Sequence, residues 1–473
     1  MNSAAIRHIH LTGICGTAMG ALATLLKESG YRVTGSDAHA YPPMSTVLRE
    51  QGIAVMEGFR AENLEPAPDL VVIGNAMSRG NEEVEAALER KLHYISFAEA
   101  LKEFFIRGKT SLVVTGTHGK TTASSLLAWV LECAGREPGF MIGGVPENFG
   151  LGARLGGGKL FVTEGDEYDT AFFDKRSKFV HYLPDCVIVN NIEFDHADIF
   201  ESVEAIELSF ARMLNLVPRN GLVVANASDA RVMRLTEKSW CPRVTFGLTE
   251  RADWTAREII ETERGSEFVL AGPVGHICCR MPQHGLHNVS NALGVAALCG
   301  HLGVSLGQIA EGFAAFRGVR RRLQRLSAPA NVVLYDDFAH HPTAIAETLR
   351  AVRVAHPGRR IWALFEPRSN TTVRNIFQTE LARAFSAAGA VLIAGIYRQD
   401  KIPPEQRLDT VRLVADLRRE GVDAHYLADP EAILAHVAVR VQPGDVIVLM
   451  SNGAFGGLAE RLPVALSDNP NLR

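Results

Sequence analysis

Short apolar runs alternate with amphipathic stretches along the first hundred residues. The runs HIHLTGI, YRVTGSD and DLVVIGN are each followed by apolar residues at helical spacing, over 19–29, 44–51 and 81–91. Strands that alternate with helices are typical of βαβ units and a parallel sheet. We therefore predict a Rossmann-like N-terminal domain over residues 1–108.

The same alternation continues in two further blocks. Residues 109–327 contain the apolar runs SLVVT, LFVTEG and CVIVNN, and they end in FRGVRRRLQ just before the linker-like SAPAN. Residues 328–473 begin with VVLYDD and alternate again through ALFEP, GAVLIAG and DVIVLM. The prediction is an α/β protein with three domains. The central sheet is of the parallel P-loop ATPase type, and the C-terminal domain is Rossmann-like.

Composition agrees with this organisation and excludes some functions. A chain of 473 residues is long enough for about three domains, and 47% hydrophobic residues supply a core for each. The net charge of −4 gives no indication of a basic surface that would bind a nucleic acid or an anionic membrane, so we expect small substrates. The seven cysteines lack CxxC spacing, and no apolar run has the length of a membrane span. We predict a cytoplasmic protein with reduced thiols and leave its oligomeric state open.

The stretch VVTGTHGKTT, residues 113–122, carries the clearest chemistry. Gly116 and Gly119 permit close approach of the backbone to phosphates, Lys120 supplies a cation, and Thr121 or Thr122 a hydroxyl for Mg²⁺. The common loop is GxxxxGK[ST], and Val114 stands where its first glycine would be, so this loop is a variant. We predict a site for a nucleoside triphosphate that also includes Thr117 and His118.

Carboxylates follow this loop at the end of a later strand, in EGDEYD. Glu164 is our first candidate for a Mg²⁺ ligand and Glu167 the second, because hard oxygen donors suit Mg²⁺. Farther along, NNIEFDHAD places His196 between Asp195 and Asp198, which suits either a metal ligand or a capping loop.

Three later segments add candidates for nucleotide contacts. GLHNVSNAL places Asn288 and Asn291 in the first turn of a helix, where amides either cap the helix or pair with an adenine edge. The arginine run at 320–322 either clamps phosphate or only faces solvent. DDFAHHP opens the third block at a strand end, which makes Asp337 and His340 candidates for ligand contacts.

The turn GICGTAMG, residues 13–20, sits where a dinucleotide fingerprint would be, with Asp37 at the end of the second strand. Its glycines Gly13 and Gly16 are three residues apart, so it does not match GxGxxG. By itself such a turn signifies either a phosphate contact or tight packing.

These motifs in this order resemble the Mur ligase family of ATP-dependent, amide-forming enzymes of peptidoglycan metabolism. The segments that carry the resemblance span nearly the whole chain: TGTHGKTT, EGDE, NNIEFDH, GLHNVSNA, GVRRR and DDFAHHP. Within the family, GICGTAMG with GSDAHAYPPMS, DEYDTAFFDKRSK, FEPRSNT and MSNGAFGG is similar to members that ligate UDP-N-acetylmuramate to a recycled tripeptide, L-Ala-γ-D-Glu-meso-diaminopimelate. The alternative is the ligation of L-alanine in de novo synthesis. Either role belongs to cell wall biogenesis, and thereby to cell shape and cell division.

The resemblance implies an acyl-phosphate mechanism with ATP and Mg²⁺, and it assigns roles to residues. Lys120, Glu164, His196, Arg322 and His340 would be catalytic, and Thr121, Glu164 and His196 would hold Mg²⁺. The nucleotide would contact Gly116, Thr117, His118, Gly119, Lys120, Thr121, Thr122, His287, Asn288, Asn291, Arg322 and Asp337. The sugar nucleotide and the peptide would contact Gly13, Gly16, Ser36, Asp37, Ser78, Asn148, Arg368, Ser369 and Asn370.

One departure from the family sharpens the metal prediction. Several Mur ligases carry a carbamylated lysine some fifteen residues after the histidine, whereas this chain has no lysine between His196 and Lys238. The resemblance then implies a second Mg²⁺ held by Glu164, His196 and water. The remote alternatives are a Rossmann-type dehydrogenase, which leaves GTHGKTT unexplained, and a non-catalytic nucleotide-binding module, which does not need metal ligands and a junction arginine.

Overall fold

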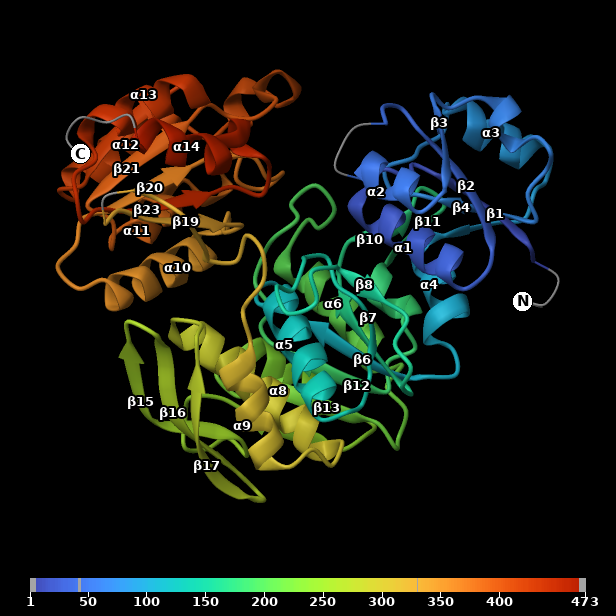
Figure 1. The fold of residues 1–473 in the computed structure, drawn as a ribbon, viewed down its shortest axis with the longest axis horizontal. Helices are drawn as coiled ribbons and strands as arrows, with labels where there is room; N and C mark the ends of the chain where they lie inside the picture. The colour runs from blue at the N-terminus through green and yellow to red at the C-terminus, as the bar shows by residue number, and fades with distance from the viewer. Residues whose placement is uncertain (1–5, 41–43, 330, 468–473) are drawn as a thin grey trace.

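Three parallel-sheet domains make up the chain in the computed structural model, which describes residues 6–40, 44–329 and 331–467. In Figure 1 the first domain (blue) and the third (orange to red) lie on either side above the central domain. Residues 41–43 of GSDAHAYPPMS, residue 330 of SAPAN and the outer ends of the first and third predicted domains lie outside the described residues. The predicted α/β class with three domains is confirmed.

The first domain has a five-stranded parallel sheet in the order β3-β2-β1-β4-β5. Its strands are β1 (His8–Thr12), β2 (Arg32–Asp37), β3 (Ala54–Glu57), β4 (Leu70–Ile73) and β5 (Tyr94–Ser96). Its helices are α1 (Thr17–Glu28), α2 (Met44–Glu50), α3 (Glu82–Glu89) and α4 (Phe97–Leu101). The strand order reverses between β1 and β4, and in open α/β sheets ligands bind at such a switch point.

The central domain has a seven-stranded sheet in the order β14-β13-β12-β6-β9-β7-β8, and only β8 runs antiparallel. Its strands are β6 (Thr110–Thr115), β7 (Gly139–Met141), β8 (Ala153–Arg154), β9 (Leu160–Gly165), β12 (Cys186–Val189), β13 (Leu222–Asn226) and β14 (Arg243–Phe246). Its helices are α5 (Lys120–Cys133), α6 (Val203–Leu214), α7 (Ala230–Thr236), α8 (Leu286–His301) and α9 (Leu306–Ala315).

Two additions to the central domain have no counterpart in the sequence prediction. One is a hairpin of β10 (Asp169–Ala171) and β11 (Asp174–Ser177), directly after the acidic segment. The other is an antiparallel sheet of β15 (Thr255–Thr262), β16 (Gly265–Gly272) and β17 (Gly275–Met281), visible at the lower left of Figure 1. This sheet packs beside α9 and shares its apolar core.

The third domain has a six-stranded sheet in the order β18-β19-β23-β20-β21-β22, with β18 antiparallel and the others parallel. Its strands are β18 (Gln324–Leu326), β19 (Val333–Asp337), β20 (Ile361–Phe365), β21 (Ala390–Ala394), β22 (Asp423–Leu427) and β23 (Val446–Met450). Its helices are α10 (Pro342–Ala355), α11 (Gln378–Ala384), α12 (Thr410–Arg419), α13 (Pro430–Arg440) and α14 (Leu458–Ser467). Strand β18 precedes the predicted boundary after residue 327, yet it pairs with the third sheet.

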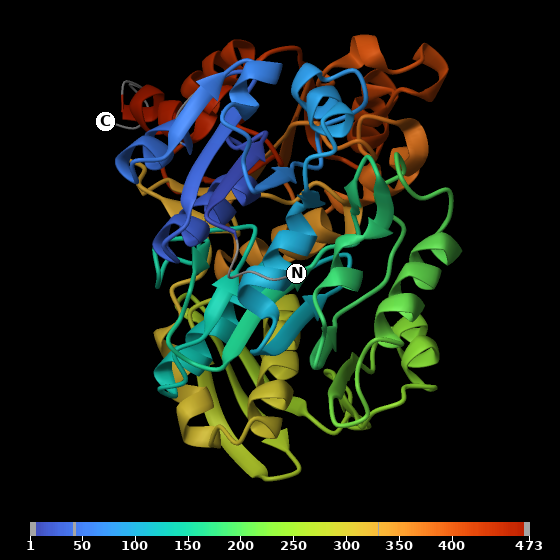
Figure 2. The same cartoon turned by 90° about the vertical axis from the view of Figure 1, so that its right-hand side faces the viewer.

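The first and central domains share an apolar core, whereas the third domain has its own. One apolar cluster runs from α1 and α4 of the first domain into the face of the central sheet that α6 and α7 cover. The opposite face of the central sheet packs against α5, α8 and α9. The two faces of the third sheet have separate clusters, made only of residues from that domain. Figure 2 shows the first domain seated on the central domain.

Candidate functional site

The phosphate loop joins β6 to α5, as the sequence predicts. Gly116 and Gly119 have φ of 136° and 82°, in the range that favours glycine, and Gly119 is the N-cap of α5. A Cβ at Gly119 would lie 2.5 Å from Asn291 Oδ1. The loop therefore presses against helix α8, and both glycines are required by the backbone.

Lys120 opens α5, and its side chain turns back along the loop. Its Nζ donates to Gly116 O at 2.6 Å and forms an ion pair with Glu167 at 2.8 Å. Burial lowers the pKa of Lys120, but the carboxylates of Glu167 and Asp166 outweigh it and hold the pKa above its ordinary value. The half-buried ammonium is therefore charged at neutral pH.

Thr121 brings together a carboxylate and an arginine. Its Oγ1 donates to Glu164 Oε2 at 3.1 Å, and Arg322 Nη2 donates to the same hydroxyl at 3.1 Å. The other Glu164 oxygen accepts from the Gly143 N–H at 2.7 Å. Burial raises the pKa of Glu164 above its ordinary value, against the opposing effect of Arg322. A hydroxyl and a half-buried carboxylate side by side are a donor set that fits Mg²⁺.

His196 contacts the second acidic candidate instead of the first. Its Nε2 lies 3.0 Å from Glu167 Oε1, and its ring packs on Tyr168 at 4.0 Å. Burial lowers the pKa of His196, but the hydrogen bond with Glu167 raises it overall. The predicted pairing of Glu164 with His196 therefore stays a prediction, while Glu167 bridges His196 and Lys120.

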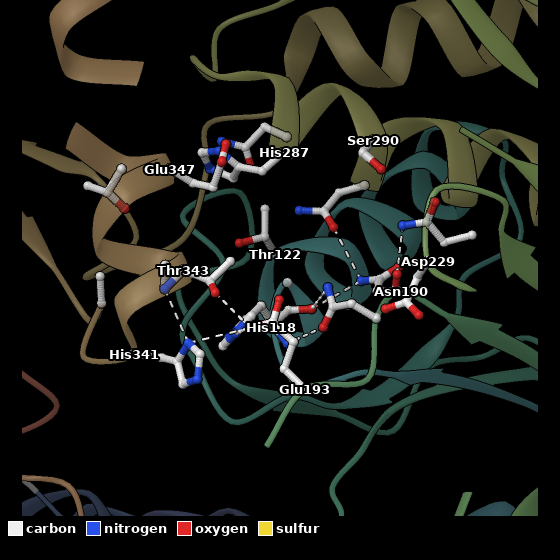
Figure 3. A pocket seen from close by; sticks show the side chains of 18 of the residues that line it. His118, Thr122, Asn190, Glu193, Asp229, His287, Ser290, His341, Thr343 and Glu347 are labelled. Atoms are coloured by element: carbon white, nitrogen blue, oxygen red, sulfur yellow. Dashed lines mark hydrogen bonds and ion pairs between the residues drawn. The ribbon is translucent and has the colours of Figure 1, made fainter. Parts of the chain in front are cut away.

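A cavity of about 1310 Å³ opens over the loop at the junction of the central and third domains (Figure 3). Nine of the predicted nucleotide contacts line it: His118, Gly119, Thr121, Thr122, His287, Asn288, Asn291, Arg322 and Asp337. Asn291 Oδ1 accepts from Asn190 at 3.2 Å, and Asn288 donates to the His284 carbonyl at 2.8 Å. The remaining predicted contacts, Gly116, Thr117 and Lys120, belong to the adjoining loop.

Asp337 fixes the backbone of the cavity wall where the central and third domains meet. Its carboxylate accepts from the N–H groups of Leu323 at 2.5 Å and Ala339 at 2.7 Å, which fixes the turn that carries Arg322. Burial raises the pKa of Asp337 to about 6. His340 donates from Nδ1 to the Phe338 carbonyl at 3.0 Å, because a carbonyl only accepts. Its Nε2, 3.9 Å from Asp195, is therefore the nitrogen with a free lone pair.

The predicted sugar-nucleotide residues gather at the switch point of the first sheet. Gly13, at φ 85°, donates to the Ser36 carbonyl at 2.8 Å, and Asp37 accepts from the Cys15 N–H at 2.8 Å. Gly16 is the N-cap of α1, and the Ser78 carbonyl accepts from the Asn81 N–H. The Ser36 side chain is fully buried and its hydroxyl donates to Glu83 at 2.7 Å, so that hydroxyl faces inward.

The predicted contacts outside the first domain lie apart from the loop. Asn148 bonds the Ala315 carbonyl and the Arg317 N–H, on the segment before the arginine run. In the third domain, Arg368 lies 3.8 Å over the Tyr397 ring, and Ser369 bonds Thr372. Asn370 crosses the junction and donates to Asp198 at 2.7 Å.

Sequence reasoning missed several polar groups of this region. Glu83 lies fully buried under the first-domain turn and accepts from four partners, namely His10, Thr12, Ser36 and Asn63. Asn190, Asn191 and Glu193 line the cavity at the end of β12. The sequence NNIE directly after an apolar strand was a usable indication of the last three, because ligand contacts gather at such strand ends.

Comparison with known families covers each domain in turn. Residues 8–108, 114–299 and 321–453 match families described as "Mur ligase family, catalytic domain", "Mur ligase middle domain" and "Mur ligase, glutamate ligase domain". Among the described residues, no helix is both long and apolar enough to cross a membrane.

Individual relatives extend this similarity over the full chain. UDP-N-acetylmuramate–L-alanyl-γ-D-glutamyl-meso-2,6-diaminoheptandioate ligase of Escherichia coli (strain K12) is 43% identical over 458 residues, 96% of this chain and 97% of that protein. UDP-N-acetylmuramate–L-alanine ligase of Acetivibrio thermocellus is 35% identical over 453 residues, 94% of this chain and 93% of that protein. A crystal structure of a murein peptide ligase from Psychrobacter arcticus 273-4 superposes with a TM-score of 0.73 at 37% identity, covering 98% of this chain and 99% of that one.

Proposed function

This chain belongs to the Mur ligase family, and on that premise we propose that it ligates UDP-N-acetylmuramate to the tripeptide L-Ala-γ-D-Glu-meso-diaminopimelate in peptidoglycan recycling. ATP would be cleaved to ADP and phosphate. The name and 43% identity of the E. coli relative support the tripeptide, since the L-alanine-adding relative is more distant at 35%.

The reaction needs two steps because an ionised carboxylate is a poor electrophile. In the first, an oxygen of the sugar's lactyl carboxylate attacks the γ-phosphorus of ATP, and ADP leaves with the electrons of the broken P–O bond. In the second, the peptide amine attacks the acyl carbon, inorganic phosphate leaves, and the nitrogen gives up a proton. Carboxylate and ATP are both anions, so the site must neutralise charge before they meet.

The cations around Thr121 would supply that neutralisation. Lys120 is charged and half-buried, and it would exchange its ion pair with Glu167 for the outer phosphates. Arg322 reaches the Thr121 hydroxyl from the domain junction, where it would contact the γ-phosphate. Thr121 and Glu164 would hold Mg²⁺, which when bound lowers the repulsion between the phosphates and the carboxylate. His196 with Glu167 is the second group that would face a metal.

His340 would receive the proton of the attacking amine. Burial lowers the pKa of His340 below its ordinary value, so the ring is neutral at pH 7. Its Nε2 carries the free lone pair and faces Asp195, whose carboxylate would stabilise the imidazolium that forms.

A second hollow, of about 340 Å³, supports a substrate larger than alanine. It lies at the carboxyl ends of β20, β21 and β22, and its lining includes Glu366, Tyr397, Arg398 and Asp429. Diaminopimelate ends in an ammonium and a carboxylate, which this mixture of charges would match, whereas the side chain of alanine is an uncharged methyl group. Arg368, stacked on Tyr397, would meet a further carboxylate of the peptide.

The observation that carries the proposal is the meeting of three distant segments at Thr121. Glu164 and Arg322, which are 43 and 201 residues from Thr121 along the chain, both contact its hydroxyl. A nucleotide-binding module without chemistry has no need of a junction arginine aimed at the metal hydroxyl.

The test is phosphate release from ATP by the purified full-length protein. We expect release only when UDP-N-acetylmuramate and the tripeptide are both present, without NAD(P), and a preference for the tripeptide when L-alanine competes. Preference for L-alanine would assign the chain to de novo synthesis. Release that is independent of the sugar, or dependence on NAD(P), would refute the ligase itself.

A further inference from the structure

Two histidines and a glutamate meet on the wall of the large cavity, apart from the groups placed around Thr121. His118 of the phosphate loop, Glu193 after β12 and His341 before α10 offer ligand atoms that all lie within 4.8 Å of one another. Figure 3 shows the three side chains converging beside Thr343. His118 Nε2 is 3.5 Å from Glu193 Oε2, and His341 Nδ1 is 3.7 Å from the same oxygen.

These separations are close to those of a tetrahedral metal site. Ligand atoms bonded at about 2.0–2.2 Å to a zinc ion stand about 3.3–3.6 Å apart along the edges of the tetrahedron. The two histidine rings are already 4.5 Å apart between centroids. Two of the three separations therefore already suit coordination, and the third, between the two histidine nitrogens, is at most 4.8 Å, so a shift of about an ångström would suffice.

One of the three ligand atoms has no hydrogen-bond partner, and hydrogen bonds orient the other two groups. His118 Nε2 is buried and has no hydrogen-bond partner, so its lone pair or proton is unsatisfied. His341 Nε2 lies 3.2 Å from the Phe194 carbonyl and must carry the proton. The Nδ1 lone pair accepts from the Thr343 N–H at 3.2 Å, so a metal ion at Nδ1 would replace that hydrogen bond. The Thr343 hydroxyl donates to Glu193 Oε2 at 2.6 Å. Carbonyl and hydroxyl partners of this kind orient the ligands in metal sites.

We propose that His118, Glu193 and His341 form a site for one divalent transition-metal ion of the zinc class, separate from the predicted Mg²⁺ position at Thr121 and Glu164. Two imidazoles and one carboxylate are a donor set for Zn²⁺ or Co²⁺, whereas Mg²⁺ prefers oxygen ligands. The fourth position faces the cavity.

The position of the site predicts its effect. His118 and Glu193 belong to the central domain and His341 to the third, so one ion would join the two domains across their junction. It would also occupy the wall of the cavity in which the nucleotide is proposed to bind. A bound ion would therefore hold the domains together and inhibit turnover. Metal binding itself does not rest on the proposed function, and it is measured without ATP.

The experiment is a Co²⁺ titration of the metal-free full-length protein in the presence of excess Mg²⁺, followed by visible absorption, with Zn²⁺ competition. We expect one equivalent to bind with the d–d bands of a four-coordinate N/O site. The variants H341N and E193Q should each weaken binding at least tenfold. Asn at position 341 can still accept from the Thr343 N–H and cap α10, and Gln at position 193 can still accept from the Thr343 hydroxyl.

The control variant is H276N, which removes an exposed histidine on β17 far from the cavity and should leave Co²⁺ affinity unchanged. Circular dichroism checks that every variant is folded. Unchanged affinity in both H341N and E193Q would overturn the proposal. So would displacement of Co²⁺ by Mg²⁺, or a sulfur-to-metal charge-transfer band, which would place the ion on a cysteine. A protein that ligates normally but binds no Co²⁺ would refute the metal site and leave the proposed function intact.

Discussion

At the scale of single residues, the ion pair between Lys120 and Glu167 must break before Lys120 can bind the phosphates of ATP. In the structure the ammonium is bonded to a carboxylate and to the carbonyl of its own loop. An incoming phosphate must therefore replace partners that already satisfy the charge. Before the phosphate binds, these partners stabilise the charged ammonium of Lys120.

Replacing Lys120 by methionine tests that role. Without the cation, the phosphates and the sugar carboxylate would repel one another in the transition state, and we expect kcat to fall by about 10²–10³-fold. Phosphate release with both substrates measures the effect. The matched control is K159M, which removes an exposed lysine of the same domain directly before β9 and should stay within twofold of the parent. Equal activity of the two variants would contradict the assignment.

His287 gives a prediction for pH. Burial lowers its pKa to about 4, whereas the same ring in the unfolded chain titrates near 6.5. Between these values the unfolded chain binds a proton that the native protein does not. Stability is therefore lost as the pH falls from 6.5 to 4, by about 1.4 kcal/mol per pH unit for this proton at most. Histidine NMR, assigned with H287Q, should show a midpoint near pH 4, and a midpoint near 6.5 would disprove it.

The residues between His196 and Lys238 predict independence from bicarbonate. This stretch contains no lysine that carbon dioxide could convert to a carbamate. Activity in carbon dioxide-depleted buffer should therefore equal activity after bicarbonate is added. Strong recovery on addition, followed by phosphate release, would mean that a lysine elsewhere in the chain takes that place.

The junction of β6 and α5 is the element that positions most of the site. Its two glycines, Gly116 and Gly119, hold the loop against Asn190 and Asn291, which stand at the ends of other elements. The loop is thus fixed by packing on β12 and α8 and not only by its own sequence.

Gly119→Ala should therefore damage the loop. The new Cβ would face Asn291 Oδ1 at 2.5 Å in a backbone conformation that alanine rarely adopts, so we expect at least a tenfold loss of kcat/KM for ATP. Gly307→Ala in α9 is the control, because nothing lies within 4 Å of its added Cβ, and helix propensity should make it neutral or slightly stabilising. Equal ATP kinetics for both variants would show that the loop tolerates the methyl group.

Elements differ in how well their sequence predicts them. The alternation of apolar strands with helices predicts the three parallel sheets, and the predicted helix over 19–29 is observed as α1 (Thr17–Glu28). Strands β15 to β17 escaped prediction because they have no regular alternation of buried and exposed residues: after its first two residues, β15 is exposed or half-buried throughout. The meeting of His118 with His341 also escaped it, since no local pattern joins residues 223 positions apart along the chain.

For the whole molecule, the two domain junctions differ in kind. The first and central domains share an apolar core, whereas the third domain meets the central one through polar contacts such as Thr371 Oγ1 to Asp195 at 2.7 Å and Asn370 to Asp198. Water can replace polar contacts at little cost, but exposing shared apolar surface is unfavourable. We therefore expect the third domain to move while the first stays in place.

The variant T371V should favour the open arrangement, because it leaves the buried Asp195 without this donor. Small-angle X-ray scattering of the ligand-free protein should give a larger radius of gyration than the parent. Thr372 is equally buried but bonds Ser369 within its own domain, so T372V should leave the radius unchanged. Identical scattering from both variants would indicate that the junction does not depend on this bond.

The apolar core shared by the first two domains also orders events during synthesis. Its members extend from Ile6 to Cys241, so the first hundred residues leave the ribosome before the surface they pack on exists. At roughly 5–20 residues per second, about 7–27 s separate Ile106 from Cys241. During that interval the nascent chain exposes an apolar face suited to a chaperone. The clusters of the third domain, which run from Val332 to Leu466, need only residues of that domain.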